Sequence, residues 1–459
     1  MKIEELHSVY FVGIGGIGMS ALAQYFHEKG LAVYGYDRVK NANVDKLELL
    51  GIPIVFDDKT DLIDPNFCGV QSNRALVIYT PAIPKTNEIL GFLKSRGYDV
   101  IKRSEALQRV TEGTKTIAVA GTHGKTTTSA MIAHLLNFCG VKSNAFLGGI
   151  ATNFDSNVVI NEGADYTVVE ADEFDRSFLR LDPYIGIVTS IDADHLDIYE
   201  GESAVRDAFK QFANQISQDG LTLINSSVSF DLEGNRQVYG LDNRDLDITA
   251  TNIRAIDGNY RFDVWENGRS VGEIATSFPG HHNVSNALAA IGVARFLEVE
   301  WKEIKAGIAQ FKGVKRRFET HIKRENRVYI DDYAHHPKEI DACVGSVKEL
   351  YPGKRITGVF QPHLYSRTRD FADEFASSLE ALNELLLMDI YPAREEPIEG
   401  VESSMLLNKI QMVNKKLCNR DEVIDEVLRL NPEVLLTMGA GDIDKLVVPL
   451  KDAIDKKDE

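Results

Sequence analysis

A short run of the chain, Gly121-Thr-His-Gly-Lys-Thr-Thr127, has the residue types that bind nucleotide phosphates. Its glycines let backbone N–H groups approach phosphate oxygens, Lys125 supplies a positive charge, and the Thr126 hydroxyl can ligate Mg²⁺. Apolar β-branched residues precede the run and apolar residues at helical spacing follow it, so we expect a turn between a strand and a helix. Val119 stands where the general phosphate-loop pattern has a glycine, which makes this loop a shortened variant.

A second polar run, Glu170-Ala-Asp-Glu173, follows a predicted strand at residues 166–169. Ligands of open α/β sheets bind at the carboxyl ends of strands, and carboxylate oxygens there can hold Mg²⁺ opposite the phosphate loop. We assign this role to Glu170 because it directly abuts the strand. We interpret Glu173 and Asp175 as parts of a solvated acidic loop.

A further predicted strand at residues 185–191 leads to the run Asp192-Ala-Asp-His-Leu-Asp197. His195 in this run has two interpretations, as a metal ligand or as a loop histidine bonded to a neighbouring carboxylate. The spacing alone leaves both open.

Residues 221–279 alternate short apolar runs with Asn, Asp and Gly turns, which predicts a β-rich excursion. The next segment, Gly280-His-His-Asn-Val-Ser-Asn286, opens a predicted helix. Asn283 and Asn286 can read an adenine edge through their amide groups, and the alternative is that they cap the helix.

Near the start of the chain, Gly13, Gly15 and Gly18 follow a predicted strand at residues 9–12. These glycines fit the fingerprint of a dinucleotide-binding turn, and Asp37 ends the next predicted strand at the distance that reaches a ribose hydroxyl. Taken alone, the pattern indicates NAD or a related nucleotide. The alternative is merely a tight turn between a strand and a helix.

The C-terminal third of the chain restarts the alternation of strands and helices. Polar, turn-forming loops follow four predicted strands, at residues 328–330, 356–360, 385–388 and 434–438. This pattern predicts another α/β sheet with its active edge on one side. This region is preceded by two adjacent arginines, Arg316 and Arg317, whose guanidinium groups are suited to bind a phosphate. The alternative is that they are an ordinary pair of surface residues.

The composition is that of a globular protein, with 44% hydrophobic and 26% charged residues. A formal net charge of −18 argues against a nucleic-acid or anionic-membrane partner, because a polyanion would be repelled. The four cysteines are scattered, with no paired spacing for zinc, which suits a reducing compartment. Since neither a signal peptide nor an apolar run of membrane-spanning length is evident, we expect a cytoplasmic protein without a membrane partner.

At 459 residues the chain is too long for one ordinary core, and its length suggests about three domains. The polar segment at residues 111–115 reads as the first linker. We therefore expect an α/β protein of three domains. These are a Rossmann-like N-terminal domain at residues 1–111, a central P-loop ATPase-like α/β domain with a β-rich excursion at 112–313, and a C-terminal Rossmann-like domain at 314–459.

Together these motifs resemble those of the Mur ligase family, and the resemblance covers all three domains. The shortened phosphate loop is the form found in Mur ligases and folylpolyglutamate synthetases. Six further motifs occur in the family's order, and an ordered set is far more specific than any single motif. They are Glu170-Ala-Asp-Glu173, Asp194-His-Leu-Asp197, Gly280-x-His-Asn-x-x-Asn286, Arg316-Arg-Phe-Glu319, Asp331-Asp-Tyr-x-His-His-Pro337 and Phe360-Gln-Pro-His363.

The resemblance implies a division of roles along the chain, with a UDP-sugar bound by the first domain despite its NAD-like glycines. The implied ATP-binding residues are Gly121, Thr122, Gly124, Lys125, Thr126, Thr127, His282, Asn283, Asn286, Arg317 and Asp332. The implied metal ligands are Thr126, Glu170 and His195. The implied UDP-sugar contacts are Gly15, Gly16, Ile17, Gly18, Ser20, Asp37 and Thr80. On the amino-acid side are Tyr333, His335, His336 and Arg367, and the implied catalytic residues are Lys125, His123, His335 and Arg367.

Two positions limit this transfer of roles. Leu364 stands where some relatives carry an arginine, so any contribution from that position is open. Several Mur ligases carry a carbamoylated lysine beyond the His-x-Asp motif, and Lys210 lies in that region, but the sequence does not establish the modification.

The motifs are most similar to those of family members that join L-alanine to UDP-N-acetylmuramic acid. The resemblance therefore implies an ATP- and Mg²⁺-dependent ligase of peptidoglycan precursor synthesis. It would phosphorylate the lactyl carboxylate of the sugar, and the alanine amine would then attack the acyl phosphate. His335 is a candidate for handling the amine proton, since the pKa of an unperturbed imidazole lies near neutrality. We expect a monomer or a weak homodimer.

Three alternatives stay open at this point. The nearest is a murein-recycling ligase that adds a tripeptide to the same UDP-sugar. A nicotinamide-dependent oxidoreductase built on residues 13–37 would leave the Lys125 loop and every later motif unexplained. A non-catalytic nucleotide-sensing module is disfavoured because Thr126, Glu170 and His195 are all present.

Overall fold

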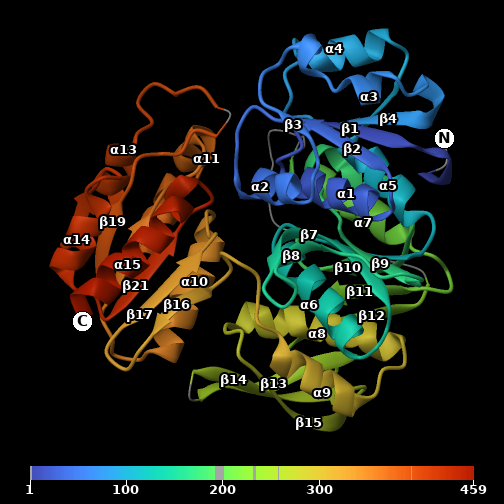
Figure 1. Ribbon diagram of the computed structural model, residues 1–459. Helices are drawn as coiled ribbons and strands as arrows, with labels where there is room; N and C mark the ends of the chain where they lie inside the picture. The colour runs from blue at the N-terminus through green and yellow to red at the C-terminus, as the bar shows by residue number, and fades with distance from the viewer. Residues whose placement is uncertain (1–2, 192–200, 231–233, 257, 394, 459) are drawn as a thin grey trace. The chain divides into compact units, whose positions relative to one another are not determined.

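The computed structural model describes residues 3–191, 201–230, 234–256, 258–393 and 395–458. The chain divides into two compact units (Figure 1). The first comprises residues 1–251, 263–272 and 285–311, and the second comprises residues 252–262, 273–284 and 312–459. Both units are built from β-sheets with helices packed on them, as the alternation of strands and helices in the sequence predicts.

The N-terminal part of the first unit is a small α/β layer. Its elements are β1 (Ser8–Val12), α1 (Ile17–Glu28), β2 (Ala32–Tyr36), α2 (Ala42–Leu49), β3 (Ile54–Val55), α3 (Pro65–Cys68), β4 (Ala75–Tyr79), α4 (Glu88–Ser95), β5 (Asp99–Lys102) and α5 (Arg103–Thr111). The five strands form a parallel sheet in the order β3-β2-β1-β4-β5. Val9 and Phe11 of β1 enter one apolar cluster and Tyr10 and Val12 another, because successive side chains of a strand alternate between faces. Helices α1 and α5 cover the first face, and α3 and α4 cover the second (Figure 1).

A ten-stranded sheet follows in the chain. Its strands and the helices beside them are β6 (Lys115–Ala120), α6 (Lys125–Phe138), β7 (Ser143–Ala151), β8 (Ser156–Val159), β9 (Tyr166–Glu170), η4 (Phe174–Arg180), β10 (Pro183–Val188), α7 (Glu202–Asn214), β11 (Leu221–Asn225), β12 (Arg236–Leu241), β13 (Ile248–Ile256), β14 (Asn259–Glu266), β15 (Arg269–Thr276), α8 (His281–Phe296) and α9 (Trp301–Gln310). The strand order is β15-β14-β13-β12-β11-β10-β6-β9-β7-β8. Strands β9, β6 and β10 are parallel neighbours, so the loops that follow them meet at one edge of the sheet.

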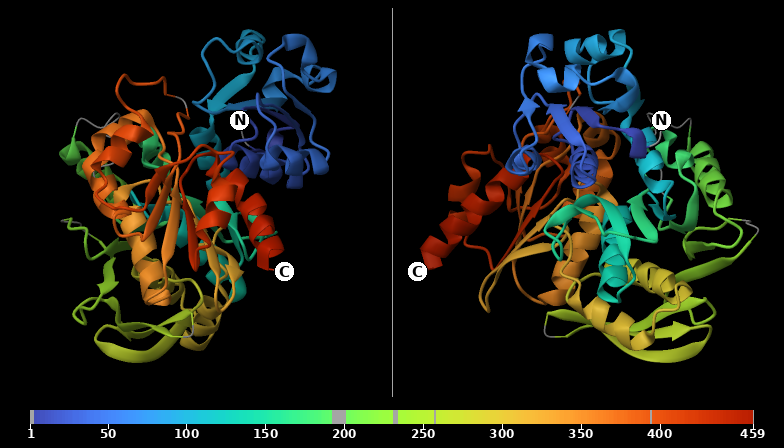
Figure 2. Two further views of the ribbon diagram at one scale, coloured as in Figure 1. Left: turned by 90° about the vertical axis from the view of Figure 1, so that its left-hand side faces the viewer. Right: turned by 45° about the vertical axis from the view of Figure 1, so that its right-hand side comes forward.

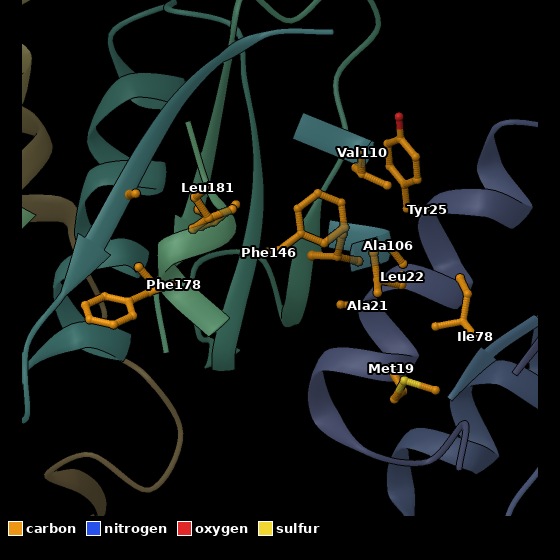
Figure 3. Close-up of a cluster of buried hydrophobic side chains, with 14 of the residues drawn as sticks. Met19, Ala21, Leu22, Tyr25, Ile78, Ala106, Val110, Phe146, Phe178 and Leu181 are labelled. Atoms are coloured by element: carbon orange, nitrogen blue, oxygen red, sulfur yellow. The ribbon is translucent and has the colours of Figure 1, made fainter. Parts of the chain in front are cut away.

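A continuous apolar core joins the two sheets of the first unit (Figure 3). Tyr25 of α1 and Ala106 of α5 enter it from one side, and Phe146 of β7 and Phe178 of η4 enter it from the other. The rings of Tyr25 and Phe146 lie 5.5 Å apart between centroids, and Phe178 stacks on Phe212 of α7. Burial of this shared apolar surface explains why both sheets belong to one compact unit.

The second unit is built on a six-stranded sheet in the order β16-β17-β21-β18-β19-β20. Its elements are β16 (Glu319–Lys323), β17 (Val328–Asp332), α10 (Pro337–Leu350), β18 (Ile356–Phe360), α11 (Tyr365–Asp370), α12 (Ala372–Leu379), β19 (Glu384–Leu387), α13 (Ser403–Lys409), β20 (Lys415–Leu417), α14 (Val423–Leu430), β21 (Val434–Met438) and α15 (Val447–Asp458). Strand β16 pairs antiparallel with β17, and the other pairs are parallel. Helices α10 and α15, orange and red, lie on opposite faces of this sheet (Figure 2, left).

The α/β class is confirmed, and strands β11–β15 confirm the β-rich excursion predicted for residues 221–279. The strand predicted at residues 185–191 ends earlier, at Val188. Strands β16 and β20 were missed because short or polar edge strands lack the apolar run that marks an interior strand. Among the described helices none has both the length and the apolar character needed to cross a membrane.

We expect the substitution Phe178→Ala to destabilise the first unit by about 3–5 kcal/mol, because it leaves a cavity among Phe209, Phe212 and their neighbours. The midpoint of urea unfolding, followed by circular dichroism, measures the effect. Val413→Ala is the control, since Val413 is 92% exposed and its loss should change stability by less than about 0.5 kcal/mol. Equal midpoints for the two variants would contradict the placement of Phe178 in the core.

Candidate functional site

The phosphate loop lies between β6 and α6, as predicted. Gly121 has a φ of +140°, and a Cβ there would come within 2.0 Å of the Thr189 hydroxyl oxygen. Gly124 lies in the left-handed region at φ +82°, and its Cβ would come within 2.8 Å of Asn286. Both positions therefore require glycine for backbone conformation as well as for space.

Two residues after β10 hold the loop in place. The Ser190 hydroxyl accepts the His123 N–H at 3.0 Å, and the Thr189 hydroxyl donates to the His123 carbonyl at 2.5 Å. The Thr122 N–H donates to the Ser190 carbonyl at 3.2 Å, and Thr127 is buried in the first turn of α6. Thr189 and Ser190 were not predicted as supporting residues, because in the sequence they fall inside the strand expected at residues 185–191.

The two side chains that phosphate binding requires each contact a carboxylate. Thr126 Oγ1 donates to Glu170 and lies 2.9 Å from its Oε2. Lys125 Nζ lies 2.8 Å from Glu173 Oε2 and also donates to the Gly121 carbonyl at 2.5 Å. The predicted proximity of Thr126 and Glu170 is therefore present in the fold.

Glu173 corrects the sequence-based interpretation, which placed it in a solvated loop. Its side chain is only 2% exposed. The reason is that η4, which begins directly after Glu173, inserts Phe178 into the apolar core and draws this segment inward. Burial by itself would lower the pKa of Lys125. The carboxylates of Glu173, Glu170 and Asp172 together raise it by more, so the pKa of Lys125 lies above its ordinary value.

Thr126 and Glu170 supply oxygen donors of the kind that Mg²⁺ prefers. A Cβ at Gly148 of β7 would lie 2.0 Å from Glu170 Oε2, so this glycine leaves room for the carboxylate. Across the described ranges, no three His, Cys, Asp or Glu side chains gather into a metal-binding group. His195, the third predicted ligand, lies outside the described residues. Lys210 lies on α7 with its side chain exposed.

The predicted adenine-side residues share helix α8. Asn286 lies beside the phosphate loop, and its Oδ1 accepts a hydrogen bond from the Thr128 hydroxyl at 3.1 Å. Asn283 is buried, and its Nδ2 donates to the Pro279 carbonyl at 2.5 Å. His282 is exposed near the start of the helix. Both asparagine side chains therefore make structural hydrogen bonds within the protein. A structural role of this general kind was the alternative to adenine binding that the sequence left open.

A cavity of about 320 Å³ lies between the glycine turn of the first sheet and strands β7 and β9 of the second. Four residues predicted for the sugar site line it: Gly16, Ile17, Gly18 and Thr80. Glu170 of the predicted metal site also lines it. Arg103 at the start of α5 lines the same cavity, and its guanidinium lies 3.6 Å from Asp172. Arg103 was not predicted as a site residue, although its place directly after β5 is a usable signal.

The other predicted sugar-site residues do not line this cavity. Asp37 Oδ2 accepts the Gly15 N–H at 2.8 Å, and its Oδ1 accepts the Val39 N–H at 3.1 Å. Ser20 is buried in α1, and its hydroxyl donates to the Ile17 carbonyl. The Asp37 carboxylate therefore serves to close the glycine turn. In a dinucleotide site this carboxylate would bind a ribose, so its engagement disfavours the nicotinamide alternative.

In the second unit, several predicted residues gather at the carboxyl end of β17. Asp332 accepts the N–H groups of Phe318 and Ala334, each at 2.7 Å, and burial raises the pKa of Asp332 to about 6. The Arg317 guanidinium lies 4.8 Å from the centroid of the Tyr333 ring. Asp332 thus holds together the two loops that carry Arg317 and Tyr333.

His335 lies within the same group. Its Nδ1 lies 2.9 Å from the Tyr333 carbonyl, and because a carbonyl only accepts, Nδ1 donates and Nε2 keeps its lone pair. Burial lowers the pKa of His335 to about 4; Glu339, 3.2 Å away, opposes this shift, and Arg367 and Arg317 reinforce it. The imidazole is therefore neutral near pH 7, and its pKa lies well below the unperturbed value on which its candidate role in handling the amine proton was based.

His336 and Arg367 belong to nearby parts of the second unit. His336 caps α10 through its ring, which also packs against Phe371 with centroids 4.9 Å apart. Arg367 is partly buried in α11, directly after the loop that follows β18. His363 of that loop lies 5.8 Å from His335 between ring centroids. His363 was not predicted as a site residue, although it ends the Phe360-Gln-Pro-His363 motif, which is a usable signal.

Most of the chain matches known protein domains of one kind. Residues 8–115 match the Mur ligase family, catalytic domain; residues 119–294 match the Mur ligase middle domain; and residues 316–441 match the Mur ligase, glutamate ligase domain.

Full-length relatives share nearly half of their residues with this chain. The UDP-N-acetylmuramate–L-alanine ligase of Parabacteroides distasonis is 45% identical over 100% of this chain and 99% of its own length. The enzyme of that name from Flavobacterium psychrophilum is 46% identical, with both chains covered completely. Among solved structures, a UDP-N-acetylmuramate-alanine ligase from Thermotoga maritima superposes with a TM-score of 0.83 at 27% identity, covering 98% of this chain and 99% of its own. A murein peptide ligase from Psychrobacter arcticus, at 22% identity and a TM-score of 0.69, shares the fold over 98% of each chain.

The lowered pKa of His335 predicts a specific loss of stability in mild acid. The unfolded chain takes up a proton at this residue near pH 6.5, and the folded chain does so only near pH 4, so stability falls as the pH drops through this window. Between pH 7 and pH 5 the native chain should lose about 2 kcal/mol more than the variant His335→Asn. Urea unfolding at both pH values measures this difference, and identical losses would contradict the burial of a neutral imidazole.

Proposed function

The chain belongs to the Mur ligase family, and from this premise we propose that it joins L-alanine to the lactyl carboxylate of UDP-N-acetylmuramic acid with ATP. The products would be UDP-N-acetylmuramoyl-L-alanine, ADP and phosphate, as a step of peptidoglycan precursor synthesis. The proposal rests on full-length relatives that carry the name of this ligase. It includes a cytoplasmic location, supported by cysteines that all lack a disulfide partner and by the need for ATP.

One geometric observation carries the proposal furthest. A single cavity is lined by the glycine turn of the first sheet and by Glu170, which contacts Thr126 of the phosphate loop. A sugar nucleotide bound by the glycine turn could therefore extend its reactive end towards the γ-phosphoryl group of ATP. An oxidoreductase would have no use for a phosphate loop at the far end of its cofactor site.

The chemistry requires that the sugar carboxylate first become a good acyl donor. A free carboxylate is a poor one because its oxygen is a poor leaving group. Transfer of the γ-phosphoryl group gives an acyl phosphate, and attack by the alanine amine then expels inorganic phosphate. This pathway needs charge stabilisation and exclusion of water more than it needs a covalent role for the protein.

The first unit would supply the phosphoryl-transfer residues. Lys125 would offset the negative charge of the moving phosphoryl group, and the backbone N–H groups between Gly121 and Gly124 would contact the phosphates. Thr126 and Glu170 would hold Mg²⁺, which neutralises phosphate charge when bound. Arg103 would contact an anionic part of the UDP-sugar, because it is a cation on the wall of the cavity.

The second unit would supply the amino-acid side and part of the nucleotide site. Arg317 would contact phosphate and Asp332 the ribose, as the family resemblance implies. Tyr333, His336 and Arg367 would bind near the sugar carboxylate and the alanine. His335 can accept a proton at Nε2, but its lowered pKa makes it a weak base, so we assign it to orientation of the amine. We retain the division into domains at residues 1–111, 112–313 and 314–459 as part of this proposal.

We predict that Lys125→Ala lowers kcat/KM for ATP by at least about a thousandfold, because the charge that stabilises the transferring phosphoryl group is lost. Phosphate release with ATP, Mg²⁺, UDP-N-acetylmuramic acid and L-alanine measures the loss. Lys59→Ala is the matched control, since Lys59 is exposed in the first unit and distant in sequence from every site motif. Full activity of the Lys125 variant would overturn the assignment of the phosphate loop.

The choice of acceptor separates the proposal from its nearest alternative. With UDP-N-acetylmuramic acid and ATP held constant, we expect L-alanine to support phosphate release at least about a hundredfold better than the L-alanyl-γ-D-glutamyl-diaminopimelate tripeptide. Mass spectrometry of the product checks that an amide has formed. A preference for the tripeptide would identify the chain as a recycling ligase instead.

A further inference from the structure

Glu173 has no role in the proposed function, yet its side chain pairs with Lys125 of the phosphate loop. Lys125 Nζ donates to the Gly121 carbonyl at 2.5 Å and lies 2.9 Å and 2.8 Å from the two carboxylate oxygens of Glu173. A third acceptor, the Thr122 carbonyl, lies at 3.4 Å. An ammonium group has three N–H donors, so these acceptors account for all of them.

The two carboxylates near the loop differ in their surroundings. Glu170 lines the cavity and faces the Thr126 hydroxyl, as a metal ligand should. Glu173 is not among the residues that line the cavity, and its side chain is 2% exposed. It stands at the start of η4, where its carbonyl accepts the Arg176 N–H at 3.0 Å. Its position is therefore set by the packing of η4 and not by a ligand.

ATP must take at least one N–H donor of Lys125 away from these acceptors. The Gly121 and Thr122 carbonyls both belong to the loop backbone and stay with it, so Glu173 is the side-chain partner that has to give way. A buried carboxylate without its counter-ion is costly. Nucleotide binding therefore works against the Lys125–Glu173 pair, and departure of the products restores it.

We propose that Glu173 is the resting counter-ion of Lys125, a positioning residue that keeps the lysine at the phosphate loop and lowers nucleotide affinity by competing for it. This inference rests on the proposed function, because it assumes that ATP binds the loop. Its consequence is that the chain holds ATP and ADP less tightly than the loop alone would allow, which favours release of ADP after each turnover.

The test is calorimetric binding of ATP and of ADP, each with Mg²⁺ and without the other substrates. Glu173→Gln keeps the shape of the side chain and removes its charge, so both dissociation constants should fall about tenfold. Glu173→Asp keeps the charge but draws it back from Lys125, so an intermediate fall of about threefold is expected. Glu162→Gln is the matched control, since Glu162 is exposed, and it should stay within about twofold of the native chain.

A mutant cycle separates competition from a structural effect. In the Lys125→Met background, Glu173→Gln should leave ATP affinity unchanged, because the group being competed for is gone. Unchanged or weaker ATP binding by folded Glu173→Gln would overturn the inference. If circular dichroism finds that variant unfolded, Glu173→Asp decides in the same way. A native chain that binds no ATP would instead refute the proposed function, so the two failures are distinguishable.

Discussion

An ammonium group that is almost entirely buried must have a counter-charge, and the centre of the first unit is arranged around that requirement. The Lys125 side chain is 13% exposed, and Glu173, at 2% exposed, meets it with both carboxylate oxygens. Five residues further along the chain, Phe178 of η4 enters the apolar core and fixes the segment that carries Glu173. Core packing and site electrostatics therefore depend on the same few residues. A change that loosens η4 would alter the charge balance of the phosphate loop as well as stability.

Parallel strand order explains how residues distant in sequence become neighbours at this site. Strands β9, β6 and β10 lie side by side, so Glu170, the phosphate loop and Thr189 all lie at carboxyl ends of strands, at one edge of the sheet. The second unit repeats the arrangement on β17, β21 and β18, where Asp332 ends β17 and the loop containing His363 follows β18, on either side of β21. In both units the sheet supplies rigid positions and the loops supply the chemistry.

The common apolar core of the first unit gives its cavity a fixed shape. Because Tyr25 and Ala106 pack in the same cluster as Phe146 and Phe178, the glycine turn of one sheet and Glu170 of the other line one space. Arg103 and Asp172 face each other across this space as a partly exposed ion pair at 3.6 Å, a geometry that contributes little to stability. Under the proposed function, the contribution of Arg103 is to bind an anionic part of the substrate and not to hold the fold.

The sequence by itself determined the α/β class, the phosphate loop, the pairing of Thr126 with Glu170 and the family, because these depend on local periodicity and on residues at short, fixed spacing. It could not determine that Asp37 closes the glycine turn, that Arg103 lines the cavity or that Glu173 is buried against Lys125. Each of these depends on contacts between segments 22 to 69 residues apart or on the packing of η4. The lowered pKa of His335 is of the same kind, since burial is a property of the whole packed unit and not of the residues beside it in the chain. Only tertiary structure decides which of many similar carboxylates and imidazoles leave water, and that desolvation sets their charge and their role.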